Sequence, residues 1–158
     1  DRFGFEFPER ELYDTDAIAA DFTAIDFEDS PLAILVVDDE PAVLEVTQIL
    51  LENEGWNVVT ACDGQTALEA LDESTMPFGC IVLDLVMPNV SGDAVLAQIQ
   101  ARKIKTPVVV VSGYSATQLG AFREHSNVVK VLEKPFPAEL LIDAVNKSIN
   151  KMHSAVKL

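Results

Sequence analysis

The sequence predicts an α/β fold in which one five-stranded parallel sheet carries helices on both faces, preceded by an N-terminal extension. Short aliphatic runs alternate with longer stretches of helical periodicity, and the runs are continuous instead of alternating with polar residues. A strand that is buried on both faces has such a continuous run. A helix between two successive strands allows the second strand to lie parallel to the first.

The expected elements follow one another from residue 32 onward. The strands are 32–37 (LAILVV), 56–61 (WNVVTA), 80–84 (CIVLD), 107–112 (PVVVVS) and 128–132 (VVKVL). The helices are 41–54, 64–73, 91–101, a short 115–122, and 137–151. Pro41 and Pro137 fall in the first turns of their helices, where a missing backbone N–H leaves no hydrogen bond unmade.

The first thirty residues differ in composition from the rest of the chain. They contain ten acids against two arginines, and six of the eleven aromatic residues of the chain. This aromatic content is high for a disordered tail. The sequence therefore predicts an extension or linker at 1–30 that docks on its own domain, on a second copy in a homodimer, or on a neighbour. A domain at 31–152 and a tail at 153–158 complete the division.

Composition and charge exclude several classes of partner. The net charge is −15, which argues against direct binding to nucleic acid or to an anionic membrane surface. No apolar run approaches the length of a membrane span, and no secretory signal opens the chain. Cys62 and Cys80 are expected to be buried free thiols. We therefore expect a cytoplasmic location, and the Asp1 start fits a fragment of a longer protein.

Polar residues follow four of the five expected strands. Asp38 and Asp39 end the first strand, Asp84 the third and Ser112 the fourth, and the fifth leads into Lys134. In an open parallel sheet the ligand crevice lies at the carboxyl ends of the strands, where the strand order reverses. The five side chains are therefore expected to share one crevice.

The chemistry of this crevice indicates a metal and a phosphoryl group. Three carboxylates brought together repel one another, and a hard cation such as Mg²⁺, or Mn²⁺ in its place, removes the repulsion. A lysine and a hydroxyl beside the metal complement the charge of a phosphoryl group. Asp84 is the expected nucleophile, because a carboxylate can take a phosphoryl group and form an acyl phosphate.

Each of these residues also has an ordinary structural interpretation. Asp39 or Glu40 could be a helix N-cap, Asp84 and Ser112 could be turn residues, and Lys134 could be solvated. Their convergence at the strand ends of one crevice favours the functional interpretation.

Four segments resemble the signatures of the response-regulator receiver domain of two-component signalling. They are ILVVDDEP (34–41), CIVLDLVMPNVSG (80–92), VVVVSGYS (108–115) and VLEKPF (131–136), in the order and spacing of that family. The resemblance covers 32 to about 151 and implies a flavodoxin-like, receiver-type fold. It further implies a signalling domain, not an enzyme, that catalyses its own phosphotransfer and dephosphorylation, either alone or as part of a hybrid histidine kinase.

The resemblance also implies a metal-ligand set. Asp39 and Asp84 would ligate Mg²⁺ together with the backbone carbonyl of Val86, and Asp38 would act through a water on the metal.

The resemblance implies the phosphoryl chemistry as well. Asp84 would accept the phosphoryl group from the phosphohistidine of a histidine kinase or a histidine phosphotransfer protein. Ser112 would hydrogen-bond that group. Lys134 would pair with Asp84 before phosphorylation and with the phosphoryl group afterwards, and its bond to Pro135 would be cis.

One position departs from the family pattern. The switch residue three positions before the lysine is usually aromatic, and here it is Val131. The usual coupling of hydroxyl and aromatic is therefore in doubt, and Tyr114 is the candidate to transmit the signal or to gate the site.

The leading function is thus a phospho-switch that alters binding to a downstream protein partner. One alternative is a Mg²⁺-dependent phosphohydrolase of the haloacid-dehalogenase type. That type needs a second aspartate two residues after the nucleophile, where this chain has Val86, so the general acid is missing. The other alternative is an interaction module that works without phosphorylation, with the extension mediating dimerisation.

Overall fold

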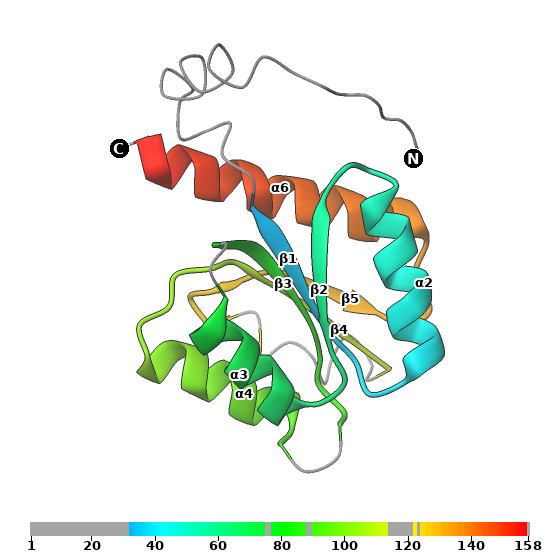
Figure 1. Ribbon diagram of the computed structural model, residues 1–158, viewed down its shortest axis with the longest axis horizontal. Coiled ribbons are helices and arrows are strands. Elements are labelled where there is room, and N and C mark those ends of the chain that lie inside the picture. The colour runs from blue at the N-terminus through cyan, green and yellow to red at the C-terminus, as the bar shows by residue number, and fades with distance from the viewer. Residues whose placement is uncertain (1–31, 75–76, 88–89, 114–121, 123, 158) are drawn as a thin grey trace, which may run out of the picture. The chain divides into compact units, whose positions relative to one another are not determined.

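A parallel sheet of five strands forms the centre of the described part of the chain (Figure 1). The computed structural model describes residues 32–157, except 75–76, 88–89, 114–121 and 123. The strands are β1 (Ala33–Val37), β2 (Asn57–Ala61), β3 (Phe78–Asp84), β4 (Val108–Ser112) and β5 (Val128–Glu133). The helices are α2 (Pro41–Glu52), α3 (Gly64–Glu73), α4 (Gly92–Ala101) and α6 (Ala138–Lys157).

The strand order places a crevice between β1 and β3. The order is β2-β1-β3-β4-β5, and every neighbouring pair is parallel. The chain moves from β1 outward to β2 and then returns to the other side of β1 with β3, so the order reverses there. Ligands of such sheets bind at this reversal. The predicted fold class is confirmed.

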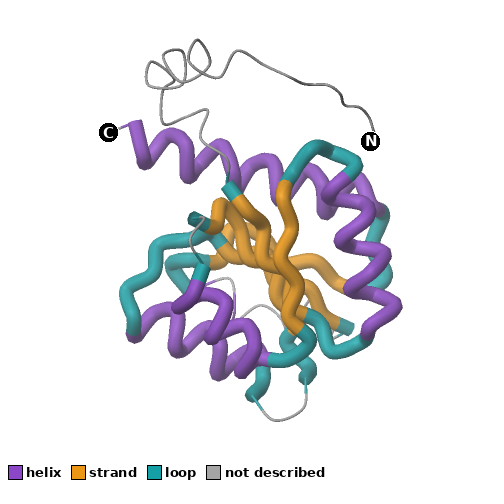
Figure 2. Tube along the Cα trace, viewed as in Figure 1, coloured by secondary structure: helices purple, strands orange, loops and turns teal. Residues whose placement is uncertain are grey.

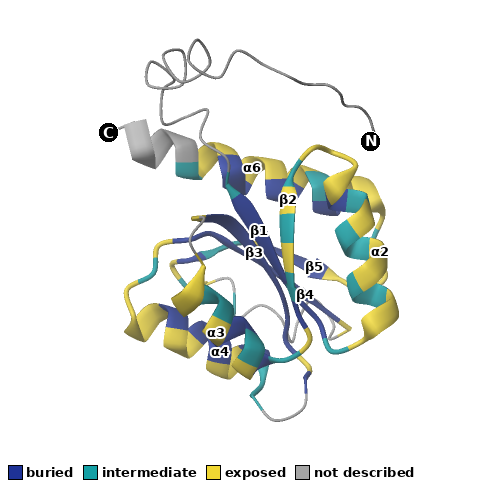
Figure 3. Ribbon diagram, viewed as in Figure 1, coloured by how far each residue is buried: buried dark blue, intermediate teal, exposed yellow. Residues whose placement is uncertain are grey.

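Helices cover the two faces of the sheet in pairs, as Figure 2 shows, with α2 and α6 on one face and α3 and α4 on the other. Side chains along a strand alternate between the faces. Leu35 and Val37 of β1 accordingly pack in the cluster that includes α4, whereas Ile34 and Val36 pack in the cluster that includes α6. The central strands are buried along their length, whereas exposed and half-buried residues alternate along most of the edge strand β2 (Figure 3).

Two local expectations are wrong. The last helix is expected to end at 151, but it continues to Lys157 and includes most of the expected tail. Cys62 is exposed because it follows the edge strand β2, while Cys80 of the central strand β3 is buried as predicted.

Several expectations fall outside the described residues. The extension at 1–30 and most of the short helix at 115–122 lie there, so the proposed domain division stays a prediction. Among the described residues, no helix is both long and apolar enough to cross a membrane.

Gly92 lets α4 begin in contact with the end of β3. A Cβ atom at Gly92 would lie 2.5 Å from the carbonyl oxygen of Asp84 and 2.5 Å from the Cα of Leu85. The backbone N–H of Gly92 also donates to the carbonyl of Leu85 at 3.1 Å. The absence of a side chain at this position therefore keeps the turn after Asp84 in place.

We predict that Gly92→Ala lowers the free energy of unfolding by about 1–3 kcal/mol, because backbone atoms must shift to admit the methyl group. Urea denaturation measures the change. Gly113→Ala is the control, since a Cβ there meets no atom of the described residues within 4 Å, and it should change stability by less than about 0.5 kcal/mol. Equal effects of the two substitutions would contradict the steric explanation.

Candidate functional site

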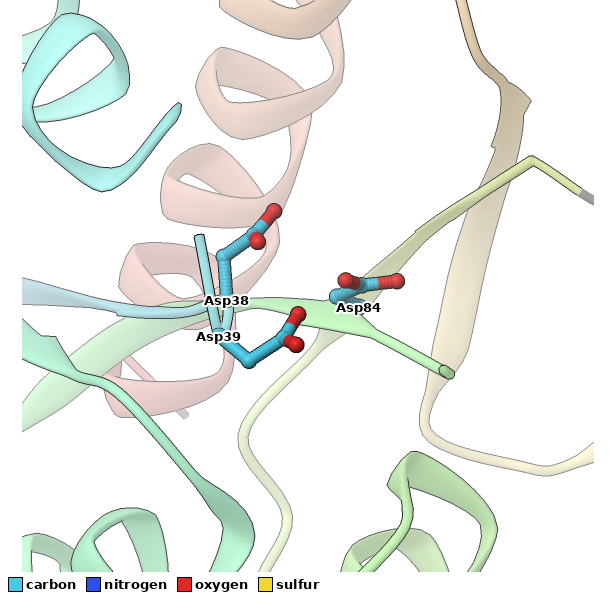
Figure 4. Close-up of side chains that lie close together, drawn as sticks. All are labelled: Asp38, Asp39 and Asp84. Atoms are coloured by element: carbon cyan, nitrogen blue, oxygen red, sulfur yellow. The ribbon is translucent and has the colours of Figure 1, made fainter. Parts of the chain in front are cut away.

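Three aspartates meet at the carboxyl edge of the sheet (Figure 4). Asp38 and Asp39 follow β1, and Asp84 ends β3, the neighbouring strand. One carboxylate oxygen from each lies within 4.8 Å of the others. Asp38 is 2% exposed and Asp84 is 4% exposed, so water screens these two charges poorly.

The backbone orients the two buried carboxylates in the same way. Oδ1 of Asp38 accepts a hydrogen bond of 3.0 Å from the N–H of Glu40, and Oδ1 of Asp84 accepts one of 3.2 Å from the N–H of Val86. Both contacts reach two residues along the chain, as aspartates in turns commonly do. Each carboxylate is therefore fixed by one oxygen and presents the other, Oδ2, to Lys134.

Lys134 bridges these two presented oxygens. Its Nζ lies 3.1 Å from Oδ2 of Asp38 and 3.6 Å from Oδ2 of Asp84. The hydrogen bond goes to Asp38, whereas the family resemblance implies a pair with Asp84. Only the longer ion pair joins Lys134 to Asp84, so the ammonium is shared between the two carboxylates.

A backbone hydrogen bond joins Lys134, directly after β5, to the end of β4. The backbone N–H of Lys134 donates to the carbonyl of Ser112 at 2.7 Å. Ser112 itself is fully buried at the end of β4, next to the strand that carries Asp84. The Lys134–Pro135 peptide bond is cis, as the resemblance implies.

The site shifts the pKa values of its charged groups. Burial raises the pKa of Asp84, as do the neighbouring charges of Asp38 and Asp39, and together they outweigh the opposing effects of Lys134 and the Val86 N–H. Burial acts to lower the pKa of Lys134. The hydrogen bond to Asp38 and the charges of the surrounding acids outweigh it, so the pKa of Lys134 rises.

A crevice of about 510 Å³ opens beside these groups. The described residues that line it are Asp39, Glu40, Asp84, Val86, Gly113 and Lys134. Val86 is half exposed there, while its carbonyl remains a predicted ligand.

Sequence reasoning missed Glu40 as a residue of the crevice and treated it as a candidate helix cap. Glu40 does stand at the N-cap position of α2, but its side chain makes no capping hydrogen bond. Its place in the acidic run Asp38-Asp39-Glu40 is the signal that could have identified it.

Of the two predicted switch positions, Val131 lies among the described residues and Tyr114 does not. Val131 is 6% exposed and packs in the cluster that includes α4, with Val110 as its neighbour on β4. Tyr114 lies outside the described residues, so its role stays a prediction.

Comparison with known proteins places the chain in a family. The model of the response regulator receiver domain matches residues 34–146. The chain belongs to this family. It is therefore a receiver domain of two-component signalling. Domains of this type receive phosphoryl groups from histidine kinases and act as switches when they are phosphorylated.

Relatives and solved structures agree with this assignment. The transcriptional regulatory protein FixJ of Bradyrhizobium diazoefficiens is 30% identical over 124 residues, which are 78% of this chain and 60% of FixJ. A receiver domain protein from Clostridium thermocellum is 28% identical with a TM-score of 0.70, over 77% of this chain and 96% of that one. The receiver domain therefore spans only part of such a relative.

The response regulator TrrA of Thermotoga maritima was solved in complex with Mg²⁺-BeF. It is 28% identical to this chain with a TM-score of 0.64, over 74% of this chain and 98% of that one.

The raised pKa of Asp84 leads to a prediction about stability. A raised carboxyl pKa means that the folded state disfavours the ionised form, so ionisation costs stability once the pH exceeds the ordinary value of 3.8. With a chelator present, we expect Asp84→Asn to increase the free energy of unfolding at pH 7. The gain should vanish as the pH falls below 3.8, where the carboxyl group is protonated in both states.

Denaturant titrations across this pH range measure the difference. Asp93→Asn is the control, because Asp93 is an exposed carboxylate in the first turn of α4, and it should bring no gain. Loss of stability at pH 7 in Asp84→Asn would contradict the prediction.

Proposed function

We propose that Asp84 accepts a phosphoryl group from the phosphohistidine of a histidine kinase or a histidine phosphotransfer protein, and that the phosphorylated domain changes its binding to a protein partner. The observation that carries this proposal is the arrangement of Asp84. It is a buried carboxylate at a strand end, beside two further carboxylates and a shared lysine.

In the proposed transfer a carboxylate oxygen of Asp84 attacks the phosphorus atom. The new O–P bond forms as the N–P bond to the donor imidazole breaks, and the imidazole leaves with the electron pair. The shared ammonium of Lys134 lies where the negative charge of the transferred group accumulates and can stabilise that charge. Ser112, at the end of the adjacent strand, is the proposed hydroxyl donor to the same group.

The aspartates fit a hard divalent cation. All three side chains offer oxygen ligands, and these converge within 4.8 Å on one side of the crevice. Asp39, Asp84 and the carbonyl of Val86 are the proposed ligands of Mg²⁺ or Mn²⁺, and Asp38 contributes through water. When bound, the cation would supply charge neutralisation for the carboxylates and for the phosphoryl oxygens.

Phosphorylation is tested by intact mass after incubation with a small phosphoryl donor and Mg²⁺. We expect the mass to increase by one phosphoryl group, because the carboxylate is a competent nucleophile beside a cationic site. Asp84→Asn and addition of a chelator are the two controls, and each should abolish the gain. If the folded wild-type protein gains no mass, the proposal fails and an interaction module that works without phosphorylation takes its place.

The switch of this domain is proposed to use Tyr114. The family's aromatic at the position of Val131 is replaced by a shorter side chain that is already buried, so no ring is present there to swing inward. Tyr114 follows Ser112 by two residues in the sequence. We propose that its ring limits the access of water to phosphorylated Asp84.

We therefore expect Tyr114→Ala to shorten the phosphoryl lifetime at least about threefold, as removal of a gate admits water to the acyl phosphate. Mass spectrometry monitors the loss of the phosphoryl group from Asp84 over time and so gives the lifetime. Val131→Ala is the matched control, since it should lower stability by about 1 kcal/mol or more and leave the lifetime unchanged. An unchanged lifetime and unchanged partner binding in Tyr114→Ala would remove Tyr114 from the switch.

A further inference from the structure

The β3–α4 loop, residues 85–91, joins the proposed nucleophile to the helix that follows, and the structure describes it except at 88–89. Leu85 and Met87 are buried in the cluster that includes α3 and α4, whereas Val86 between them is 51% exposed and lines the crevice. The loop thus directs two side chains into the core and places Val86 at the site. Whatever fixes this loop therefore fixes the backbone at Val86.

The first residue of α3 contacts the loop near its far end. A Cβ atom on Gly64 would clash with the carbonyl oxygen of Val90, and it would lie 2.7 Å from the Cγ1 and 2.8 Å from the Cβ of that residue. Val90 is half-buried and packs against the same core cluster. Val90 therefore occupies the space that a side chain at position 64 would need.

The backbone conformation at Gly64 does not explain the glycine. Its φ angle lies outside the left-handed region that favours glycine, whereas Gly55 has a φ of 98°. The close approach of Val90 is thus the reason that a side chain is not accommodated at Gly64.

Asp63 fixes the start of α3 beside the loop. It is the N-cap of the helix, and its carboxylate accepts a hydrogen bond of 2.7 Å from the backbone N–H of Thr66. The carbonyl of Asp63 also accepts a hydrogen bond of 3.0 Å from the N–H of Ala67. Gly64 therefore cannot move away from Val90 without a loss of these hydrogen bonds.

Gly92 holds the loop from the other side. Its own close contacts are with the backbone at the end of β3, and its N–H donates to the carbonyl of Leu85 at 3.1 Å. The loop is thus enclosed between the start of α3, at Gly64, and the start of α4, at Gly92. Because packed protein interiors transmit strain, a displacement of Val90 is expected to reach the rest of the loop.

We propose that Gly64 is a positioning residue for the cation of the proposed metal site. Its contact with Val90 holds the β3–α4 loop where the carbonyl of Val86 can serve as a ligand. Gly64 contributes no ligand atom and acts only through the loop. This inference rests on the proposed function and adds to it a residue from a separate element of the fold.

Titration of the full chain with Mn²⁺, followed by the electron paramagnetic resonance signal of the free ion, tests the inference. We expect Gly64→Ala to raise the Kd for Mn²⁺ at least about tenfold, as the loss of outer support for a metal ligand commonly does. Added Mg²⁺ should restore phosphorylation of Asp84 in this variant, because the side chains of Asp39 and Asp84 are retained.

A second measurement needs no cation. With a chelator present, amide hydrogen exchange at Gly92 reports on the hydrogen bond that closes the loop onto Leu85. This exchange should become at least about threefold faster in Gly64→Ala, because the displaced loop opens more readily.

Two variants of the same helix are the controls. Ala67→Gly removes a fully buried methyl group from α3 and weakens the helix, but it leaves the space of Val90 unchanged. Asp72→Asn removes the ion pair of 2.6 Å between Asp72 and Arg102, which joins the other ends of α3 and α4. Each should leave the Kd for Mn²⁺ within about twofold of the wild-type value.

Val90→Gly tests the same contact from the side of the loop, and it keeps the inference testable if Gly64→Ala does not fold. It removes the side chain that packs beside Gly64 without adding an atom, and it should raise the Kd for Mn²⁺ at least about threefold. Circular dichroism shows whether each variant is folded.

The outcomes separate the inference from the proposed function. A wild-type Kd in Gly64→Ala or, if that variant does not fold, in Val90→Gly would overturn the inference and leave the proposed metal site intact. An equally large loss of affinity in Ala67→Gly would also overturn it, because general destabilisation would then be the cause. Absence of Mn²⁺ binding by the folded wild-type chain would overturn the proposed metal site, and the inference with it.

Discussion

The repulsion among three aspartates at one edge of the sheet is the constraint on which the rest of the site depends. Parallel strands bring their carboxyl ends to the same edge, so the fold itself gathers Asp38, Asp39 and Asp84. Two of them are buried, and their charges need a cation within reach. Lys134, the residue that directly follows β5, meets this need across β4, where the intervening residues Ser112 and Gly113 are small.

The fold and the composition of the site could be predicted from the sequence because their causes are local. Continuous aliphatic runs mark strands buried on both faces, and polar residues directly after those runs mark the strand ends. The exposure of Cys62 depends on its strand lying at the edge of the sheet, which the order of elements along the chain does not specify. The end of α6 is not predictable at 151 because residues 152–157 contain no glycine or proline that would end the helix.

Contacts between side chains of distant strands were the least predictable features. The sharing of Lys134 between Asp38 and Asp84 depends on the Oδ2 atoms that the two turns leave free, because the N–H groups of Glu40 and Val86 hold the Oδ1 atoms. The shift in pairing between β4 and β5, where Val108 pairs with Val128 but Val109 pairs with Lys130, is equally invisible in the sequence, because VVKVL is compatible with more than one register.

The shared ammonium of Lys134 has a consequence for the proposed metal site. In the structure the acidic crevice already holds a cation, tethered to the chain by its own side chain. A divalent ion bound as proposed would compete with that ammonium for the carboxylates, so it would replace a counterion that is already present. Filling of the proposed metal site would therefore require Lys134 to weaken or give up its contacts of 3.1 Å with Asp38 and 3.6 Å with Asp84.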